Sequence, residues 1–389
     1  MTSPKGTVAI VGTGFVADLY MRSLKTFPNI KVVGAYDIDK ARLKTFSAYW
    51  DVPVADSLNA LLSTPDLQLV LNLTNPDAHF PVSKAALEAG RHVYSEKPLA
   101  VSMVDAYALH ALANDHKLML TSAPCSWLSQ AAQSVWKAIS TGAIGTPRLV
   151  YAELDDDFIP KAPYEQWLSE SGAPWPAKDE FQTGCTLEHA GYYLTWLMAV
   201  FGPVDKVVAA SANLIPDKLP DGEETAPDYS TAIMFFKSGI VARLTCSIIA
   251  PHDHRMRIIG DDGVLELDEC WNNTAPVRIR KRHVLRRKLI NSPVARREKI
   301  DGDTHPKVGK WGAAAMNFAL GPAEMLAALE GGRPSLLDSD FALHLNEVTL
   351  AIQNAGEDAG SQKMNTSFKP VSPTPWAEAA GARTAKVHP

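Results

Sequence analysis

Two glycines near the N-terminus carry the first chemical signal in this sequence. Gly12 and Gly14 follow the apolar segment 7–12 and precede a helical pattern over 15–26, in the order Gly-Thr-Gly-Phe-Val-Ala. Gly12 allows a tight turn, and Gly14 has no side chain to keep a pyrophosphate away from the backbone. Ala17 stands at the third position and is small enough for the helix to pack on the strand. The free N–H groups of the first helical turn would then bind the phosphates of a dinucleotide.

A carboxylate follows at the spacing expected for a ribose contact. Asp37 ends the strand-like segment 31–37 and lies about 20 residues beyond Ala17, as in dinucleotide-binding folds. It would accept hydrogen bonds from the adenosine ribose and repel a 2′-phosphate, which favours NAD over NADP as the cofactor. Lys40 and Arg42 lie nearby and would accommodate a phosphate only if the loop bends toward it.

Two further polar segments follow strand-like runs and are expected at the same edge of the sheet, where ligands bind. The segment LTNPDAH (73–79) presents a turn, a hydroxyl and backbone N–H groups, and SEKPLA (95–100) places an ammonium beside a carboxylate. Alone, such a Glu-Lys pair is more often a solvated surface pair. With the glycine loop beside it, the expected cofactor-binding residues are Gly12, Thr13, Gly14, Phe15, Val16, Asp37, Thr74, Asn75, Pro76, His79, Glu96, Lys97 and Pro98.

A regular alternation of strand and helix positions these segments. Strand-like runs occur at 7–12, 31–37, 67–74, 91–97 and 117–123, with 52–55 as a candidate edge strand. Helical patterns lie at 15–26, 39–50, 56–63, 77–89 and 102–114. Apolar strands that alternate with helices are typical of a parallel sheet covered on both faces. The fold class predicted for residues 1–124 is therefore α/β, a doubly wound Rossmann sheet that binds NAD(P).

The pattern changes after residue 124. Strand-like runs at 149–155, 204–212, 229–237, 240–249, 254–260 and 263–268 are joined by short turns, and helices are expected at 129–141, 184–201, 315–331 and 338–356. Successive strands with tight turns indicate antiparallel hairpins. Residues 125–356 are therefore expected to form an α+β domain with an open, mainly antiparallel sheet. Residues 357–389, rich in Pro, Ser, Thr and Ala, are expected to form a C-terminal tail or surface strap.

Composition excludes several classes of function. The 389 residues carry a formal net charge of −5, with 46% apolar and 21% charged residues, so neither nucleic acid nor an anionic membrane is an expected partner. No apolar run approaches the roughly 20 residues needed to span a bilayer, and no signal peptide is expected. The four cysteines form no C-x-x-C pair. No metal site is therefore predicted, and reduced thiols indicate a cytoplasmic protein.

Three motifs together carry a family resemblance. GTGFVA, TNPxxH and EKP at these separations resemble the Gfo/Idh/MocA family of glucose-fructose oxidoreductase and inositol dehydrogenase, as do GAIGTPRLV (142–150), IIGDDGVLEL (258–267) and the segment 320–348. The resemblance implies a C-terminal substrate domain whose open sheet forms a subunit interface, hence a homodimer or homotetramer. It also implies a sugar, cyclitol or related polyol held against the nicotinamide. The family's EKP lysine, which hydrogen-bonds the reacting hydroxyl, maps to Lys97.

The segment that corresponds to the family's Asp-x-Gly-x-His-x-x-Asp helix departs from that pattern. Aligning Glu188 with the first Asp places Tyr192 at the catalytic His, whereas a shift by one residue places Tyr193 there. A phenol has an unperturbed pKa near 10, and the Lys97 ammonium is expected to lower the pKa of Tyr192 toward working pH. His189 is a second candidate base, or a group that orients the tyrosine. The candidate catalytic residues are Lys97, Tyr192, His189 and Glu188, with Tyr193 as an alternative proton acceptor.

Aromatic residues are expected around the substrate. Trp167 and Trp175 stand in a Pro-rich loop before this helix, and Trp127 stands where many relatives have an Asn and an Arg before a Pro. Indole rings suit the C–H faces of sugars; the alternative is that the tryptophans fill the domain junction. The predicted substrate-contacting residues are Trp127, Trp167, Trp175 and Tyr193.

A basic run lies at 277–299, with ten Lys or Arg and one acid. It is either an arm for an anionic group, such as a nucleotide-sugar diphosphate, a uronate or a partner subunit, or a solvated excursion between two strands. It has no reader motif and no stacking aromatics, so nucleic acid is not expected to bind there.

Three functions follow from these observations. The first is an NAD(P)-dependent dehydrogenase or reductase that acts on a secondary alcohol or ketone of a sugar, cyclitol or nucleotide sugar. The second is a glycosidase in which NAD transiently oxidises C3 so that elimination cleaves the bond. The third is a non-enzymatic protein that retains NAD and binds a ligand. The Lys97 ammonium favours an enzyme, because a pure sensor has no need of it.

Overall fold

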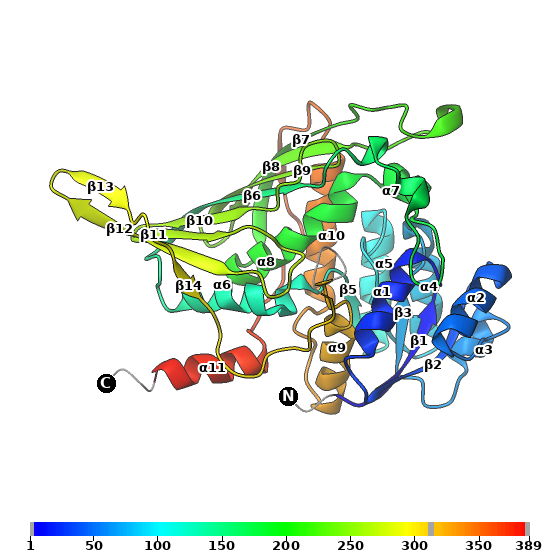
Figure 1. The fold of residues 1–389 in the computed structure, drawn as a ribbon. Helices are drawn as coiled ribbons and strands as arrows, with labels where there is room; N and C mark the ends of the chain where they lie inside the picture. Colours follow the sequence, from blue (N-terminus) through cyan, green and yellow to red (C-terminus); the bar gives the residue numbers. More distant parts are fainter. Residues whose placement is uncertain (1–3, 310–314, 386–389) are drawn as a thin grey trace.

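The N-terminal part of the chain is a parallel five-stranded sheet flanked by helices (Figure 1) in a computed structural model that describes residues 4–309 and 315–385. Its strands are β1 (Gly6–Val11), β2 (Ile30–Tyr36), β3 (Leu69–Asn72), β4 (His92–Ser95) and β5 (Leu120–Ser122). Its helices are α1 (Phe15–Leu24), α2 (Lys40–Trp50), α3 (Leu58–Leu62), α4 (Pro76–Glu88) and α5 (Met103–Asp115). The predicted Rossmann-type sheet is confirmed.

The strand order places a ligand crevice at the carboxyl ends of β1 and β3. The order is β2-β1-β3-β4-β5, and a parallel bridge between Ala35 and Val54 adds the predicted edge strand beside β2. The chain therefore reverses its direction of progress between β1 and β3, which is the topological switch point of such sheets. Residues of both strands, such as Ile10 and Leu71, are wholly buried, as expected for strands covered on both faces.

The C-terminal part is built on a ten-stranded sheet in the order β13-β12-β11-β10-β6-β9-β8-β7-β15, with β14 paired to β12. Its strands are β6 (Pro147–Asp155), β7 (Val204–Ala212), β8 (Tyr229–Phe236), β9 (Val241–Ser247), β10 (Met256–Gly260), β11 (Gly263–Leu267), β12 (Val277–Leu285), β13 (Lys288–Asn291), β14 (Arg296–Glu298) and β15 (Ser361–Lys363). Every pairing is antiparallel except β6 with β9. The predicted open, mainly antiparallel sheet is confirmed.

The remaining helices cover this sheet and join it to the first one. They are α6 (Gln130–Ser140), α7 (Ala177–Thr183), α8 (Gly191–Phe201), α9 (Leu320–Glu330), α10 (Ser339–Gln353) and α11 (Pro375–Ala385), with short 3-10 turns at Ser126–Leu128, Ile159–Lys161, Tyr164–Gln166 and Pro220–Gly222. Helix α10 packs against both α5 and β7, so it is shared between the two parts (Figure 1). In the C-terminal segment, β15 pairs with β7 and α11 lies against α6.

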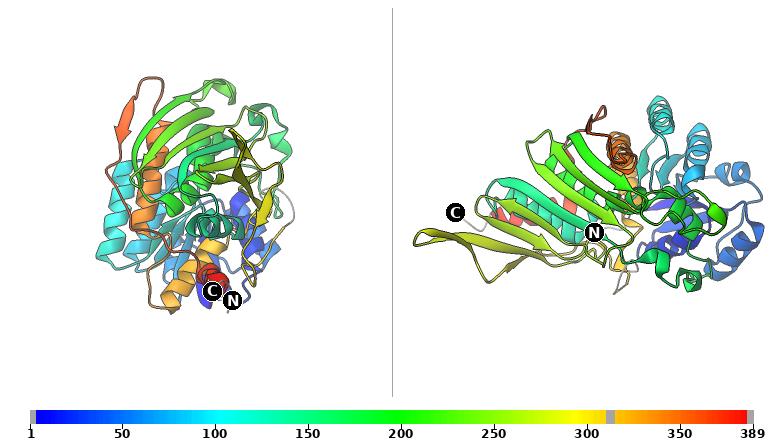
Figure 2. Two further views of the ribbon diagram at one scale, coloured as in Figure 1. Left: turned by 90° about the vertical axis from the view of Figure 1, so that its left-hand side faces the viewer. Right: turned by 90° about the horizontal axis from the view of Figure 1, so that it is seen from above.

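Two segments differ in form from the sequence-based expectation. The helix expected over 184–201 is present over 185–201, but its first part, Thr186–Ala190, is a π-helical turn that leads directly into α8, and Gly184, with a φ of +94°, ends α7 just before it. The basic run forms a hairpin of β12 and β13 that projects beyond the rest of the sheet (Figure 2), and its side chains Val284 and Leu289 are exposed. Among the described residues, helices of a length and apolarity suited to crossing a membrane are absent.

Candidate active site

A cavity of about 590 Å³ lies at the carboxyl ends of β1, β2 and β3. This volume is within the range of roughly 300–1,000 Å³ that is usual for small-molecule sites. Six of the predicted cofactor-binding residues line it, namely Gly12, Gly14, Asp37, Thr74, Asn75 and Pro76. Its opposite wall includes Thr183 and Leu187, which lie in the second half of the chain. The cavity is therefore formed by both parts of the molecule.

Glycine is needed at positions 12 and 14 for different structural reasons. Gly12 has a φ of +90°, and a Cβ atom built on it would lie 2.5 Å from the carbonyl oxygen of Leu73. Gly14 has an ordinary φ, and a Cβ there would meet no described atom within 4 Å. Gly14 also begins α1 with no side-chain cap from the described residues, so the first-turn N–H groups are available to an anion. This turn fits the pyrophosphate of a dinucleotide.

Asp37 is held at the cavity by the glycine loop itself. Its Oδ2 accepts hydrogen bonds from the backbone N and the Oγ1 of Thr13, at 2.7 and 2.8 Å. Arg42 donates from Nε to the Thr13 carbonyl at 2.7 Å and from Nη1 to the Ser171 carbonyl at 2.9 Å. Lys40 lies 4.3 Å from the centre of the Tyr36 ring. A carboxylate thus lies where a ribose would bind, and both neighbouring cations already have partners.

Several predicted cofactor residues lie behind the cavity wall instead. His79 is buried, with Nδ1 2.6 Å from the Pro98 carbonyl and Nε2 3.0 Å from the Thr74 carbonyl, so it ties two cavity loops together. Glu96 is also buried, and accepts a hydrogen bond of 2.6 Å from the Tyr20 hydroxyl. Thr13, Phe15, Val16, Glu96, Lys97 and Pro98 do not line the cavity wall. The hydrogen bonds of His79 and Glu96 hold the loops beside the cavity, and their contact with the cofactor stays a prediction.

Lys97 lies in a buried cluster of charges next to the cavity. Its ammonium donates to the carboxylate of Glu188, and Glu180 lies 3.0 Å from Nε2 of His189. Leu187 lines the coenzyme cavity and also a small space beside Lys97. The two ion pairs therefore lie at the inner end of the cavity, where the π-helical turn carries Glu188 and His189. Such turns are frequent at functional sites.

The charged groups in this cluster shift one another's pKa values. Burial and the nearby Glu180 raise the pKa of Glu188 to about 7, against the opposing effect of Lys97. Burial alone would lower the pKa of His189, but Glu180 and Asp156 outweigh it and raise that pKa to about 9. The pKa of Lys97 is likewise raised, because Glu188 and Glu180 outweigh its burial. At neutral pH, Lys97 and His189 are cations and Glu188 is near its midpoint.

The two tyrosines differ in position. Tyr192 is half-buried and its ring centre is 6.0 Å from that of Trp271. Burial raises the pKa of Tyr192 despite the opposing effect of Lys97, so the expectation of a phenol lowered toward working pH is wrong. Tyr193 is wholly buried and donates its hydroxyl to the carbonyl of His254. Tyr193 therefore belongs to the core and contacts neither cavity nor substrate space.

The tryptophans predicted to contact substrate pack into the protein. Trp127 has no exposed surface and lies in the main core, so its expected place in the pocket is wrong. Trp167 and Trp175 lie against one another, with ring centres 5.3 Å apart, and Trp175 also packs on Phe181. These two fill the junction between the loop and α7, in line with the alternative considered for them.

A different aromatic residue, Trp271, was missed. Its ring contacts the rings of His189, Tyr192, His252 and His254. The residues of this cluster that the sequence analysis did not identify are Asp156, His252, His254, Glu269 and Trp271. The available signal was their placement near strand ends: Asp156 follows β6, a His-x-His pair precedes β10, and Glu269 and Trp271 follow β11.

Comparison with known proteins gives consistent matches in both halves of the chain. The family model described as "Oxidoreductase family, NAD-binding Rossmann fold" matches residues 7–123, and the "GFO/IDH/MocA C-terminal domain" model matches residues 132–266. The bovine trans-1,2-dihydrobenzene-1,2-diol dehydrogenase is 24% identical over 271 residues, which is 68% of this chain and 75% of that protein. These matches confirm the predicted resemblance and favour neither the glycosidase nor the non-enzymatic alternative.

Solved structures share the fold across nearly the whole chain. A dehydrogenase from Bordetella pertussis in complex with NADH and UDP-GlcNAcA has a TM-score of 0.70 at 19% identity, covering 94% of this chain and 99% of that one. A 3-ketoreductase from Actinomadura kijaniata in complex with NADP has a TM-score of 0.68 at 19% identity, covering 90% and 98%. One neighbour holds NADH and the other NADP, so the shared property is an NAD(P)-binding fold.

Proposed function

Because this chain belongs to the Gfo/Idh/MocA family of NAD(P)-binding oxidoreductases, we propose that it transfers hydride between nicotinamide and a secondary alcohol or ketone of a sugar, cyclitol or nucleotide sugar. The observation that carries this proposal is the charge cluster at the inner end of the coenzyme cavity. There the Lys97 ammonium pairs with the carboxylate of Glu188, next to Leu187 of the cavity wall. An ammonium at that place stabilises the oxyanion that develops as hydride leaves a hydroxyl-bearing carbon.

The chain's own groups manage the proton of that hydroxyl. Bound nicotinamide supplies the hydride acceptor or donor. Lys97, His189 and Tyr192 all have raised pKa values and are protonated at neutral pH, whereas Glu188 has a pKa of about 7 and can accept a proton. In oxidation, Lys97 therefore passes the hydroxyl proton toward Glu188. Reduction follows the same path in reverse, so Glu188 returns its proton through Lys97 to the carbonyl oxygen, with the His189 cation beside this pair.

The test is a screen of sugars, cyclitols and nucleotide sugars for NADH or NADPH formation, followed by Lys97→Met. We expect kcat to fall by about 100-fold or more, the usual scale for a proton-handling group, while coenzyme affinity is retained. Lys84→Met is the control, because Lys84 forms only a half-exposed surface pair with Glu88. Unchanged turnover in Lys97→Met contradicts the assignment.

A folding control accompanies this variant. Lys97→Met leaves Glu188 buried without its ion-pair partner, which is destabilising. The double variant Lys97→Met/Glu188→Gln removes both charges, so it should fold while still lacking turnover. Thermal unfolding of both variants separates a catalytic loss from a structural one.

The coenzyme preference, the oligomeric state and the cellular location are also proposals. We propose NAD as the preferred coenzyme, supported by the Asp37 carboxylate at the cavity.

We propose a homodimer or homotetramer formed through the C-terminal sheet, supported by the exposed apolar side chains Val208 and Ile233 on β7 and β8. Light scattering of Ile233→Lys tests the oligomeric state, since a charge on that face should yield monomers. A cytoplasmic location is supported by four buried, unpaired cysteines.

A further inference from the structure

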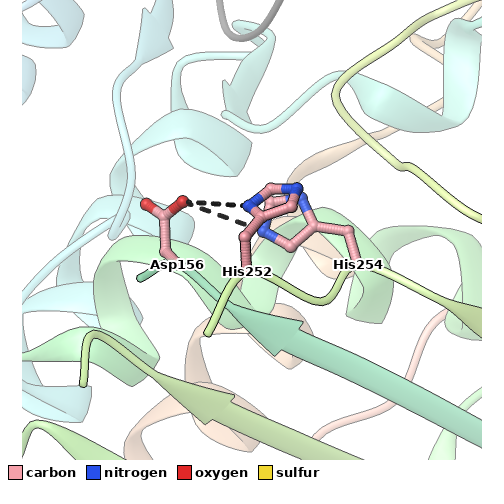
Figure 3. A group of neighbouring side chains, drawn as sticks. All are labelled: Asp156, His252 and His254. Carbon is pink, nitrogen blue, oxygen red and sulfur yellow. Dashed lines mark ion pairs between the residues drawn. The ribbon is translucent and has the colours of Figure 1, made fainter. Parts of the chain in front are cut away.

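We infer that a divalent transition-metal ion binds between Asp156, His252 and His254, beside the proposed hydride-transfer site. Asp156 follows β6, and the two histidines stand in the loop before β10. Figure 3 shows the carboxylate and both rings pointing toward one another. Oδ1 of Asp156 lies 3.7 Å from Nδ1 of His252 and 3.9 Å from Nε2 of His254. The sequence analysis predicted no metal site because it considered only the spacing of the four cysteines.

A second carboxylate, that of Glu269, lies beside the outer nitrogens of both rings and orients the rings for binding a cation. Oε1 of Glu269 lies 2.9 Å from Nδ1 of His254, and Oε2 lies 3.3 Å from Nε2 of His252. Each of these outer ring nitrogens can donate its hydrogen to Glu269. The lone pairs of the inner nitrogens, Nδ1 of His252 and Nε2 of His254, then face Asp156. This carboxylate–histidine–metal arrangement is the usual outer support of metal-binding histidines.

The inner nitrogens need a positive charge between them and Asp156. A lone pair aimed at a carboxylate oxygen is repulsive, and Nε2 of His254 is buried without a hydrogen-bond partner among the described residues. Buried polar atoms are normally paired. The three ligand atoms all lie within 4.8 Å of one another. One dication satisfies all three groups.

The donor set indicates the class of metal. Two imidazole nitrogens and one carboxylate oxygen suit Zn²⁺ and related first-row dications. Bonds of about 2.0–2.1 Å in a tetrahedral site place ligand atoms ~3.4 Å apart, so Asp156 and each histidine need to close by only a few tenths of an ångström. The His254 side chain is wholly buried, whereas that of His252 is 42% exposed. The site is therefore anchored on one side and open to a further oxygen ligand on the other.

The proposed metal site lies near His189 of the buried charge cluster. Oδ2 of Asp156 is 3.9 Å from Nε2 of His189, and Trp271 contacts both His189 and the two proposed metal-binding histidines. An oxygen of the substrate, such as a hydroxyl or carboxylate of a sugar, would complete the coordination. This role in substrate positioning rests on the proposed function, whereas metal binding itself does not.

The experiment measures metal binding directly. The full chain, freed of metal with a chelator, is titrated with Zn²⁺ by calorimetry and with Co²⁺ by visible absorption. We expect one ion per chain, with binding weakened at least 100-fold in His252→Ala and in Asp156→Asn, and about 10–100-fold in Glu269→Gln. His283→Ala, on the exposed hairpin, is the control and should bind like the wild type.

The outcomes distinguish metal binding, the proposed oxidoreductase function and the role of the metal in positioning substrate. No uptake of Zn²⁺ or Co²⁺ by the folded wild type, or equal uptake by His252→Ala, overturns the metal site. Equal uptake by His252→Ala would also indicate the neighbouring group of His254, Glu269 and Cys270 as the ligands. Metal binding with no oxidoreductase activity on any tested alcohol would contradict the proposed function and leave the site standing. Full activity with unchanged KM in the metal-free enzyme overturns the role in positioning substrate.

Discussion

The different roles of Gly12 and Gly14 yield a paired prediction from one added methyl group. Gly12→Ala should destabilise the fold, whereas Gly14→Ala should leave the fold intact and weaken coenzyme binding. The two positions are two residues apart in the same turn, so each variant is the control for the other. The contrast separates the structural need for a glycine from the need created by a bound pyrophosphate.

The expected magnitudes follow from the surroundings of each position. At Gly12 the φ of +90° and a Cβ 2.5 Å from the Leu73 carbonyl oxygen act together. Left-handed strain costs roughly 1–2 kcal/mol and overpacking roughly 1–3 kcal/mol, so the free energy of unfolding should fall by about 2–5 kcal/mol. At Gly14 the added Cβ meets nothing within 4 Å among the described residues, and a change below about 1 kcal/mol is expected. Its methyl group points into coenzyme space and should lower affinity about tenfold or more, roughly 1.4 kcal/mol.

Two measurements check the pair. Urea unfolding reports the free energy of unfolding, and calorimetry with NAD and NADP reports coenzyme affinity. A Gly12→Ala protein as stable as the wild type would refute the close approach of the first turn to Leu73. A Gly14→Ala protein that binds coenzyme as tightly as the wild type would show that the pyrophosphate does not rest on this loop.

Three further perturbations test the site. Asp37→Ser should raise the affinity for NADP relative to NAD about tenfold or more by removing the charge that repels a 2′-phosphate, and an unchanged ratio of the two dissociation constants contradicts this. Glu188 has a pKa raised from 4.5 to about 7, so kcat/KM for oxidation should fall as pH drops through about 7, and this limb should vanish in Glu188→Gln. With its raised pKa, the Glu188 carboxyl contributes stability that is present below pH 4.5 and is lost as the pH rises through 7. In Glu188→Gln, the free energy of unfolding should therefore change less with pH, by on the order of 3 kcal/mol. Tyr20→Phe should cost about 1–3 kcal/mol by leaving buried Glu96 with one donor fewer, measured by urea unfolding against Tyr49→Phe, whose side chain is exposed.

The sequence by itself determined the parts that depend on local backbone geometry. A glycine turn between a buried strand and a helix has few solutions, so Gly12, Gly14 and Asp37 could be assigned to the coenzyme cavity from their spacing. The alternation of strands and helices likewise determined the first sheet. Strand-turn-strand patterns determined the second sheet and its mainly antiparallel pairing.

Only the tertiary structure decided which side chains meet at the substrate end. Helical periodicity assumed a regular α-helix over 184–201, but Thr186–Ala190 is a π-helical turn, in which Glu188 meets Lys97 and His189 meets Glu180. Spacing could not separate Tyr192 from Tyr193, because burial of the second depends on contacts with distant strands. The cluster around Asp156 joins the end of β6 to two histidines that stand about a hundred residues later in the chain. Such meetings depend on sheet order and loop packing, which are set by long-range contacts that no local pattern in the chain encodes.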